Sequence, residues 1–143
     1  MKLKLENSPI AFNENQLALF LQTIAADYKK NISTLLFTFL NRVDMLQKNQ
    51  SYLGHDTHTD VITFDYSNET TLEAEVYISI PQATENAKKL QQNTENEFLR
   101  LIVHAVLHCV GFKDKTKDER TIMRKKEDYY LSMFHVKQHI AHV

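Results

Sequence analysis

The spacing of apolar side chains changes repeatedly along this chain, and each change predicts a boundary between a strand and a helix. Apolar residues at helical spacing from Asn13 to Lys30 predict a helix, and the β-branched and aromatic run Ile32–Leu40 predicts a strand. Weak alternation in residues 1–12 predicts a short first strand at a sheet edge. The remaining segments predict a helix over Val43–Leu53, strands over Val61–Tyr66 and Glu73–Ile80, and helices over 81–92, Phe98–Val110 and Asp118–Phe134. Residues 136–143 are left unassigned.

The order of these elements predicts the fold class. The polar residues 67–71 lie between the third and fourth strands, a spacing that favours an antiparallel hairpin. The order β-α-β-α-β-β-α-α-α predicts an α/β fold, α+β-like in its mixed sheet of about four strands, with helices packed on the sheet. We expect residues 1–143 to form one domain, because a chain of this length can bury a core without disulfides.

The most apolar predicted element is the helix Phe98–Val110. Its apolar residues cover every side, so we expect it to be central and buried. Thr94 and Glu97 have the spacing of a capping box, which predicts that Thr94 caps this helix.

This helix carries the strongest candidate for a functional site. His104 and His108 are four residues apart, so both imidazoles project from one helix face and can reach a single ion. Gly111 can take a left-handed conformation that turns the chain back, which places Asp114 as a third ligand. Two nitrogens and a carboxylate suit one divalent ion, zinc or a similar metal, and leave a position for water, as in catalytic zinc sites.

Histidines inside an apolar helix need partners, because unpaired buried polar groups cost about 1–3 kcal/mol each. The spacing also matches that of metzincin proteases, but Ala105 occupies the position of their catalytic glutamate. A peptidase mechanism would lack its proton acceptor, so peptide hydrolysis is only a minor alternative. Cys109 points about 100° around the helix from His108 and is interpreted as a core residue.

Five other histidines have simpler interpretations. His55 and His58 lie in a polar loop before Thr59-Asp60, where turn residues are expected; the alternative is that this loop lines the metal cleft. The C-terminal histidines are interpreted first as part of a solvated tail, and a second metal site is the alternative: His135, His139 and His142.

The net charge of −1 predicts no strong attraction to a polyanion, so any nucleic-acid contact must come from a local patch. Residues 113–126 contain seven basic and three acidic side chains, and this excess begins beside Asp114. We therefore predict phosphate contacts at Lys113, Lys115 and Lys117, the alternative being a solvated helix surface.

The single cysteine excludes an intramolecular disulfide, and the first six residues are too polar for a signal peptide. Apolar runs fall short of the roughly 20 residues that a membrane helix needs. A soluble, cytoplasmic protein is expected.

Four stretches between Leu46 and Leu131 resemble the bacterial YbeY family of rRNA maturation factors. The family motif H-G-x-L-H-L-x-G-Y-D-H is similar to residues 104–114, and T-D-V-L-S-F-P is similar to residues 59–65. The family strand G-D-I-x-I-S is similar to residues 74–79, and M-x-x-x-E is matched by Met123 and Glu127.

The resemblance implies an α/β fold, a zinc-like ion on His104, His108 and Asp114, and cleavage of ribosomal RNA precursors. Asp114 replaces a third histidine of the family and adds negative charge, which should weaken the ion as a Lewis acid. Leu53 aligns with a family arginine that is proposed to help catalysis.

The leading hypothesis is thus a metal-dependent single-strand endoribonuclease acting in rRNA maturation and ribosome biogenesis, with precursor rRNA or the ribosome as partner. The first alternative is a non-catalytic ribosome-associated factor that binds metal. Another metallohydrolase, acting on a small or peptide substrate, is a further alternative. The general base, the RNA site and the oligomeric state are left unassigned.

Overall fold

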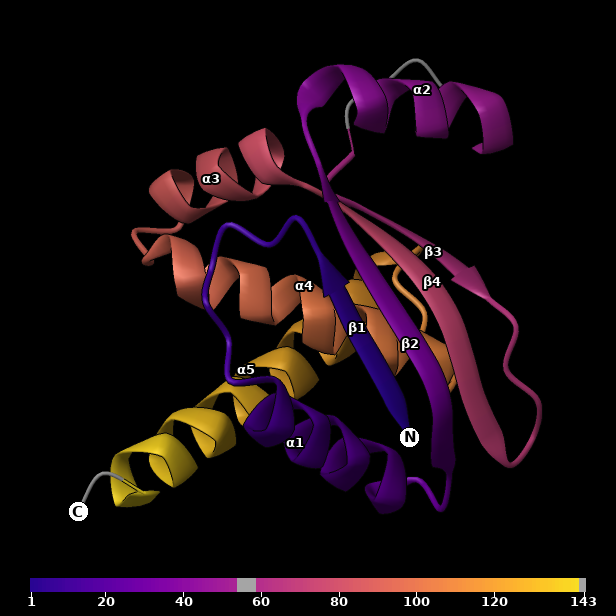
Figure 1. Ribbon diagram of the computed structural model, residues 1–143, viewed down its shortest axis with the longest axis vertical. Helices are drawn as coiled ribbons and strands as arrows, with labels where there is room; N and C mark the ends of the chain where they lie inside the picture. The colour runs from indigo at the N-terminus through magenta and orange to yellow at the C-terminus, as the bar shows by residue number, and fades with distance from the viewer. Residues whose placement is uncertain (54–58, 142–143) are drawn as a thin grey trace.

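The structure is a computed structural model that describes residues 1–53 and 59–141, and the side chains of residues 1–50 and 59–134. The elements follow the predicted order (Figure 1). They are β1 (Lys2–Glu6), α1 (Glu14–Asp27), β2 (Asn31–Leu40), α2 (Arg42–Leu53), β3 (Val61–Asp65), β4 (Thr71–Ser79), α3 (Ile80–Lys89), α4 (Thr94–Cys109) and α5 (Lys117–Ala141).

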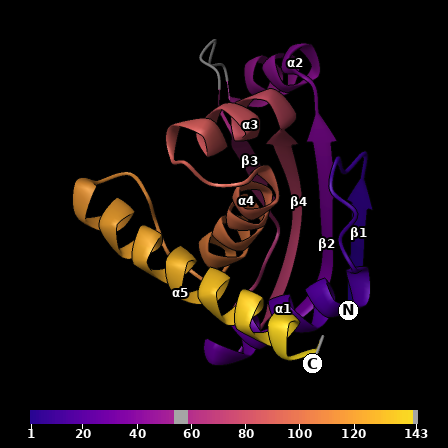
Figure 2. The same cartoon turned by 90° about the vertical axis from the view of Figure 1, so that its left-hand side faces the viewer.

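The four strands form one mixed sheet in the order β1-β2-β4-β3. β1, β2 and β4 run parallel, whereas β3 pairs antiparallel with β4. The predicted hairpin and the predicted edge position of the first strand are therefore confirmed. Figure 2 shows the sheet nearly edge-on, with α1, α3, α4 and α5 on the same side of it. This arrangement leaves α4 between the sheet and α5.

The core lies between the sheet and α4. Alternate residues of the two central strands point inward and are almost completely buried, as the two-residue period of a strand requires: Leu35, Phe37 and Phe39 of β2, and Leu72, Ala74, Val76 and Ile78 of β4. α4 is buried along nearly its whole length, so the prediction of a central apolar helix is confirmed.

Both ends of α4 follow from local sequence, although the predicted cap is wrong by one residue. Asn93 caps the helix, since its side-chain oxygen accepts a hydrogen bond from the backbone N–H of Asn96 at 2.6 Å, and Thr94 is already helical. An asparagine accepts this bond at least as well as a threonine does. At the other end Gly111 has φ +119°, and the N–H of Phe112 bonds to the carbonyl of Leu107 at 3.0 Å. The predicted turn at Gly111 is confirmed, and it sends the chain back toward α4.

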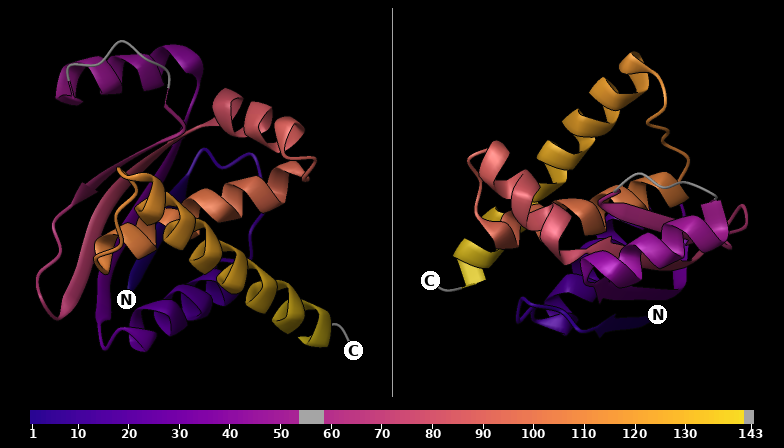
Figure 3. Two further views of the ribbon diagram at one scale, coloured as in Figure 1. Left: turned by 180° about the vertical axis from the view of Figure 1, so that it is seen from behind. Right: turned by 90° about the horizontal axis from the view of Figure 1, so that it is seen from above.

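α5 is longer than predicted, because it continues to Ala141 through most of the segment left unassigned. Residues 135–141 contain no glycine or proline, so no residue there breaks the helix. Tyr130 ties α5 to α1, since its hydroxyl donates to Oδ2 of Asp27 at 2.7 Å. Viewed from behind, α5 crosses α4 (Figure 3). None of the helices in the described part of the chain is long and apolar enough to cross a membrane.

Candidate functional site

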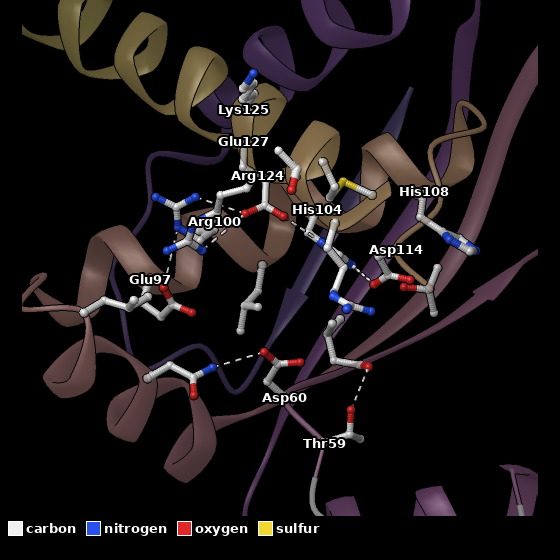
Figure 4. Close-up of a pocket in the computed structure, with 18 of the residues that line it drawn as sticks. Thr59, Asp60, Glu97, Arg100, His104, His108, Asp114, Arg124, Lys125 and Glu127 are labelled. Atoms are coloured by element: carbon white, nitrogen blue, oxygen red, sulfur yellow. Dashed lines mark hydrogen bonds and ion pairs between the residues drawn. The ribbon is translucent and has the colours of Figure 1, made fainter. Parts of the chain in front are cut away.

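A cavity of about 870 Å³ opens between α4, α5 and the start of β3, and it contains the predicted metal-site residues (Figure 4). His104 and His108 of α4 line it, as does Asp114 from the turn after Gly111. The four-residue spacing and the glycine turn thus bring all three side chains to one cavity, and their binding of one shared ion stays a prediction.

His104 is held on both ring nitrogens. Nδ1 lies 2.7 Å from Oε2 of Glu127, and Nε2 lies 3.1 Å from Oδ2 of Asp114. Burial lowers the pKa of His104, but the hydrogen bond and charge of Glu127 and the charges of Asp114 and Asp60 outweigh burial, so the pKa is raised. Nδ1–H is placed to donate to the Glu127 carboxylate, and Nε2 is directed at Asp114.

The donors at His104 and Asp114 fit a divalent ion. Ligand atoms at about 2.0–2.2 Å from a tetrahedral ion lie about 3.3–3.6 Å apart, slightly more than the observed 3.1 Å between Nε2 of His104 and Oδ2 of Asp114. A metal-binding histidine also normally donates its other N–H to a carboxylate, and Nδ1 of His104, 2.7 Å from Glu127, is placed to do so.

His108 is exposed. In the view of Figure 4, Asp114 lies between His104 and the ring of His108. Among the side chains that the structure describes, those of residues 1–50 and 59–134, no three from histidine, cysteine, aspartate or glutamate are grouped closely enough to hold a metal. His108 as the third ligand therefore stays a prediction. His55 and His58 lie outside the described residues, as does His142, and the same is true of the side chains of Leu53, His135 and His139.

A buried arginine connects this site to α5. Arg100 is 7% exposed and reaches Oε1 of Glu127 at 3.0 Å and Oδ1 of Asp128 at 2.7 Å. The patterns in the sequence did not identify Arg100 or the contact of Glu127 with His104. Arg100 precedes His104 by four residues, one helical turn, which is the only local signal that it faces the same side of α4.

Two acids lie on the cavity wall formed by α4 and the start of β3. Asp60 accepts a hydrogen bond from Nδ2 of Asn86 at 3.1 Å, and Glu97 is 2% exposed. Burial raises the pKa of Asp60 despite the opposing charge of His104, and it raises the pKa of Glu97 despite the opposing charge of Arg100. Thr59 and Asp60 line the cavity, so the end of the polar loop reaches it.

The opposite wall is basic and belongs to α5. Its cations recur at helical spacing and line the cavity: Lys117, Arg120, Arg124 and Lys125. Of the three predicted phosphate-binding lysines only Lys117 lines the cavity, and Lys113 and Lys115 are exposed outside it. The role of these lysines stays a prediction. The helical period could have singled out Arg120 and Arg124, since both lie on the same helix face as Lys117.

Cys109 is 6% exposed, and burial raises its pKa to about 12. Its interpretation as a core residue is confirmed.

The fold and the cavity define an α/β protein that presents a histidine–carboxylate site between an acidic and a basic wall. A family model described as "Endoribonuclease YbeY" matches residues 3–135. The chain belongs to this family of endoribonucleases.

Comparison with individual proteins agrees with this family assignment. The chain is 40% identical over 119 residues to the endoribonuclease YbeY of Flavobacterium psychrophilum, covering 83% of this chain and 85% of the relative. It is 35% identical over 133 residues to the endoribonuclease YbeY of Christiangramia forsetii, covering 93% of each. The solution structure of TM1509 from Thermotoga maritima shares the fold, with a TM-score of 0.67 at 23% identity, over 99% of this chain and 93% of that protein.

Proposed function

We propose that this protein is a metal-dependent endoribonuclease that cuts single-stranded RNA during rRNA maturation. The observation that carries the proposal is the geometry at His104, whose Nδ1 is held by Glu127 while Nε2 faces Asp114 in a cavity with a cationic wall. Membership of the endoribonuclease family supports the reaction class. A cytoplasmic location belongs to the same proposal, because ribosomal RNA precursors would be the substrate.

In this proposal His104, His108 and Asp114 hold one divalent ion, zinc being the preferred candidate. When bound, the ion would lower the pKa of a coordinated water or polarise the scissile phosphate. Glu127 keeps the proton of His104 on Nδ1, so Nε2 offers a lone pair to the cavity. Ala105 is 1% exposed and faces the core, which leaves no acid at the position used by zinc peptidases.

The chain would hold the RNA backbone through its basic wall. Lys113, Lys115 and Lys117 are the proposed phosphate contacts, and Lys117 has the strongest support because it lines the cavity. Arg120 and Arg124 extend the same wall along α5 by about 10 Å at 1.5 Å per residue. That is roughly the rise of three stacked nucleotides, at about 3.4 Å each.

One observation favours a second candidate, a ribosome-associated factor that binds metal but does no chemistry. His108 does not lie together with His104 and Asp114 in a ready three-ligand group within the described residues. Cleavage of a labelled single-stranded RNA by purified protein, with and without added zinc, separates the two. The proposal expects cleavage that requires the ion and disappears in His108→Ala, whereas the second candidate expects RNA binding without cleavage.

A further inference from the structure

We propose that Arg100 is a positioning residue of this site: through Glu127 it fixes the orientation of His104. The part of this inference that concerns metal rests on the proposed function. The part that concerns the His104 ring stands on contacts within the chain alone.

The guanidinium of Arg100 forms ion pairs with two consecutive residues of α5. Its two terminal nitrogens contact Glu127 at 3.0 Å and Asp128 at 2.7 Å, and its Nε lies 3.7 Å from Glu97. The planar fork of an arginine constrains direction as well as distance, unlike the single point charge of a lysine. Because it contacts neighbouring α5 residues at once, Arg100 sets the rotation of α5 against α4 at this point.

The two oxygens of Glu127 have different partners. Oε1 faces Arg100 at 3.0 Å and, at the longer distance of 3.6 Å, Nη1 of Arg124, while Oε2 faces Nδ1 of His104 at 2.7 Å. Glu127 is 5% exposed, so there is little solvent to replace either partner. Arg100 is the arginine that hydrogen-bonds Oε1, since Arg124 stays at 3.6 Å, so Arg100 determines the plane of the carboxylate. That plane determines which oxygen is available to the imidazole.

Replacing the guanidinium of Arg100 frees the carboxylate of Glu127 to rotate. The hydrogen bond at Nδ1 would then be broken part of the time, and His104 would populate the tautomer that carries its proton on Nε2. That tautomer cannot bind a metal through Nε2, the nitrogen that faces Asp114. A purely structural ion pair would affect unfolding without changing the state of the His104 ring.

The test uses Arg100→Lys and Arg100→Gln in the full chain. Nitrogen-15 NMR of metal-free protein, at a pH above the titration of His104, reports the tautomer directly. Competition with a chromophoric chelator reports the zinc dissociation constant. Tyr130→Phe is the matched control, because it removes a 2.7 Å hydrogen bond that also docks α5 but lies away from His104.

We expect wild type and Tyr130→Phe to show the Nδ1–H form, and both arginine variants to show a mixture of tautomers. Zinc binding should weaken about tenfold or more in the arginine variants, a typical loss for groups that orient a metal ligand, and by less than about twofold in Tyr130→Phe. Folded arginine variants with the wild-type tautomer would overturn the inference. If wild type binds no zinc, the proposed metal site fails, while the NMR result still decides the role of Arg100.

A double-mutant cycle covers the case in which Arg100→Gln does not fold. If Arg100 acts through Glu127, then Arg100→Lys in the Glu127→Gln background should change neither the tautomer nor zinc affinity by more than about twofold. Effects that multiply in the double variant would show that Arg100 acts by another route, and the inference would be wrong.

Discussion

Glu127 lies 2.7 Å from Nδ1 of His104 although 23 residues separate them in the sequence. This contact joins α5 to the central helix and leaves the second nitrogen of His104 facing Asp114. The pair therefore explains how a buried apolar helix can present one polarised imidazole to an open cavity.

Glu127→Gln tests the value of this contact for metal binding. The amide keeps the size of the side chain but lacks the charge, so we expect zinc affinity to fall about 10–100-fold. Competition with a chromophoric chelator measures the zinc affinity. Glu69→Gln, an exposed acid outside the cavity, is the control. Unchanged affinity in Glu127→Gln would contradict the role given to this carboxylate.

The basic wall of α5 should govern RNA affinity. Neutralising Lys117 and Arg120 with glutamine should weaken binding of a short single-stranded RNA. The slope of log affinity against log salt should fall by about 0.7 for each RNA phosphate that the protein no longer neutralises. Fluorescence anisotropy at several salt concentrations measures both. The pair Lys113→Gln and Lys115→Gln removes the same charge from the two proposed contacts outside the cavity, where we expect a smaller effect. A larger effect of this pair would place the RNA on a different surface.

The turn that carries Asp114 depends on a capping box at the start of α5. The hydroxyl of Thr116 accepts from the N–H of Glu119 at 3.1 Å, and the Glu119 carboxylate accepts from the N–H of Thr116 at 2.9 Å. Thr116→Ala should lower the free energy of unfolding by about 1 kcal/mol. Denaturant titration measures it, with Thr23→Ala within α1 as the control. A difference under about 0.3 kcal/mol between the two variants would count against the cap.

The capping box of Thr116 and Glu119 also predicts that the stability of the fold depends on pH. Hydrogen bonds from the backbone of Thr116 and Lys115, and from the Thr116 hydroxyl that Thr116→Ala removes, lower the pKa of Glu119, so its folded pKa lies below its unfolded value. The stabilisation is present above the unfolded pKa of about 4.3 and is lost as pH falls through the folded pKa. Carbon-13 NMR titration should show Glu119 protonating at lower pH in wild type than in Thr116→Ala. If Glu119 titrated at the same pH in both proteins, the predicted effect of the capping box on its pKa would be wrong.

Cys109 should be inert in the native state. Burial raises its pKa to about 12, so almost no thiolate forms near neutral pH, and the side chain is 6% exposed. A thiol-reactive dye should label the protein in denaturant but not under native conditions. Rapid native labelling would show that α4 opens or packs differently from the structure.

Much of the fold follows from periodicity. The strand and helix order, the central apolar helix and the glycine turn at Gly111 were all predictable, because each depends on residues close in sequence. The four-residue spacing also brought His104 and His108 to one cavity. The start of α4 was less visible, since Asn93 rather than Thr94 caps the helix.

Contacts across long separations could not be predicted in this way. Arg100 meets Glu127 only because α5 crosses α4, and nothing in either segment alone fixes that crossing. The helical period groups Lys117, Arg120 and Arg124 on one face of α5, but that this face borders the cavity depends on how α5 packs, and Lys113 and Lys115 precede α5. Tertiary packing, and not local propensity, decides both.

The most direct test of the account is RNA cleavage by His108→Ala. His108 is exposed, so the substitution should leave thermal unfolding unchanged while it removes a proposed metal ligand. Wild-type protein with zinc should cut internal bonds of a labelled single-stranded RNA, and the variant should be slower by at least about 100-fold. Absence of cleavage in wild type, or equal cleavage by folded His108→Ala, would contradict a metal-dependent endoribonuclease site at this position.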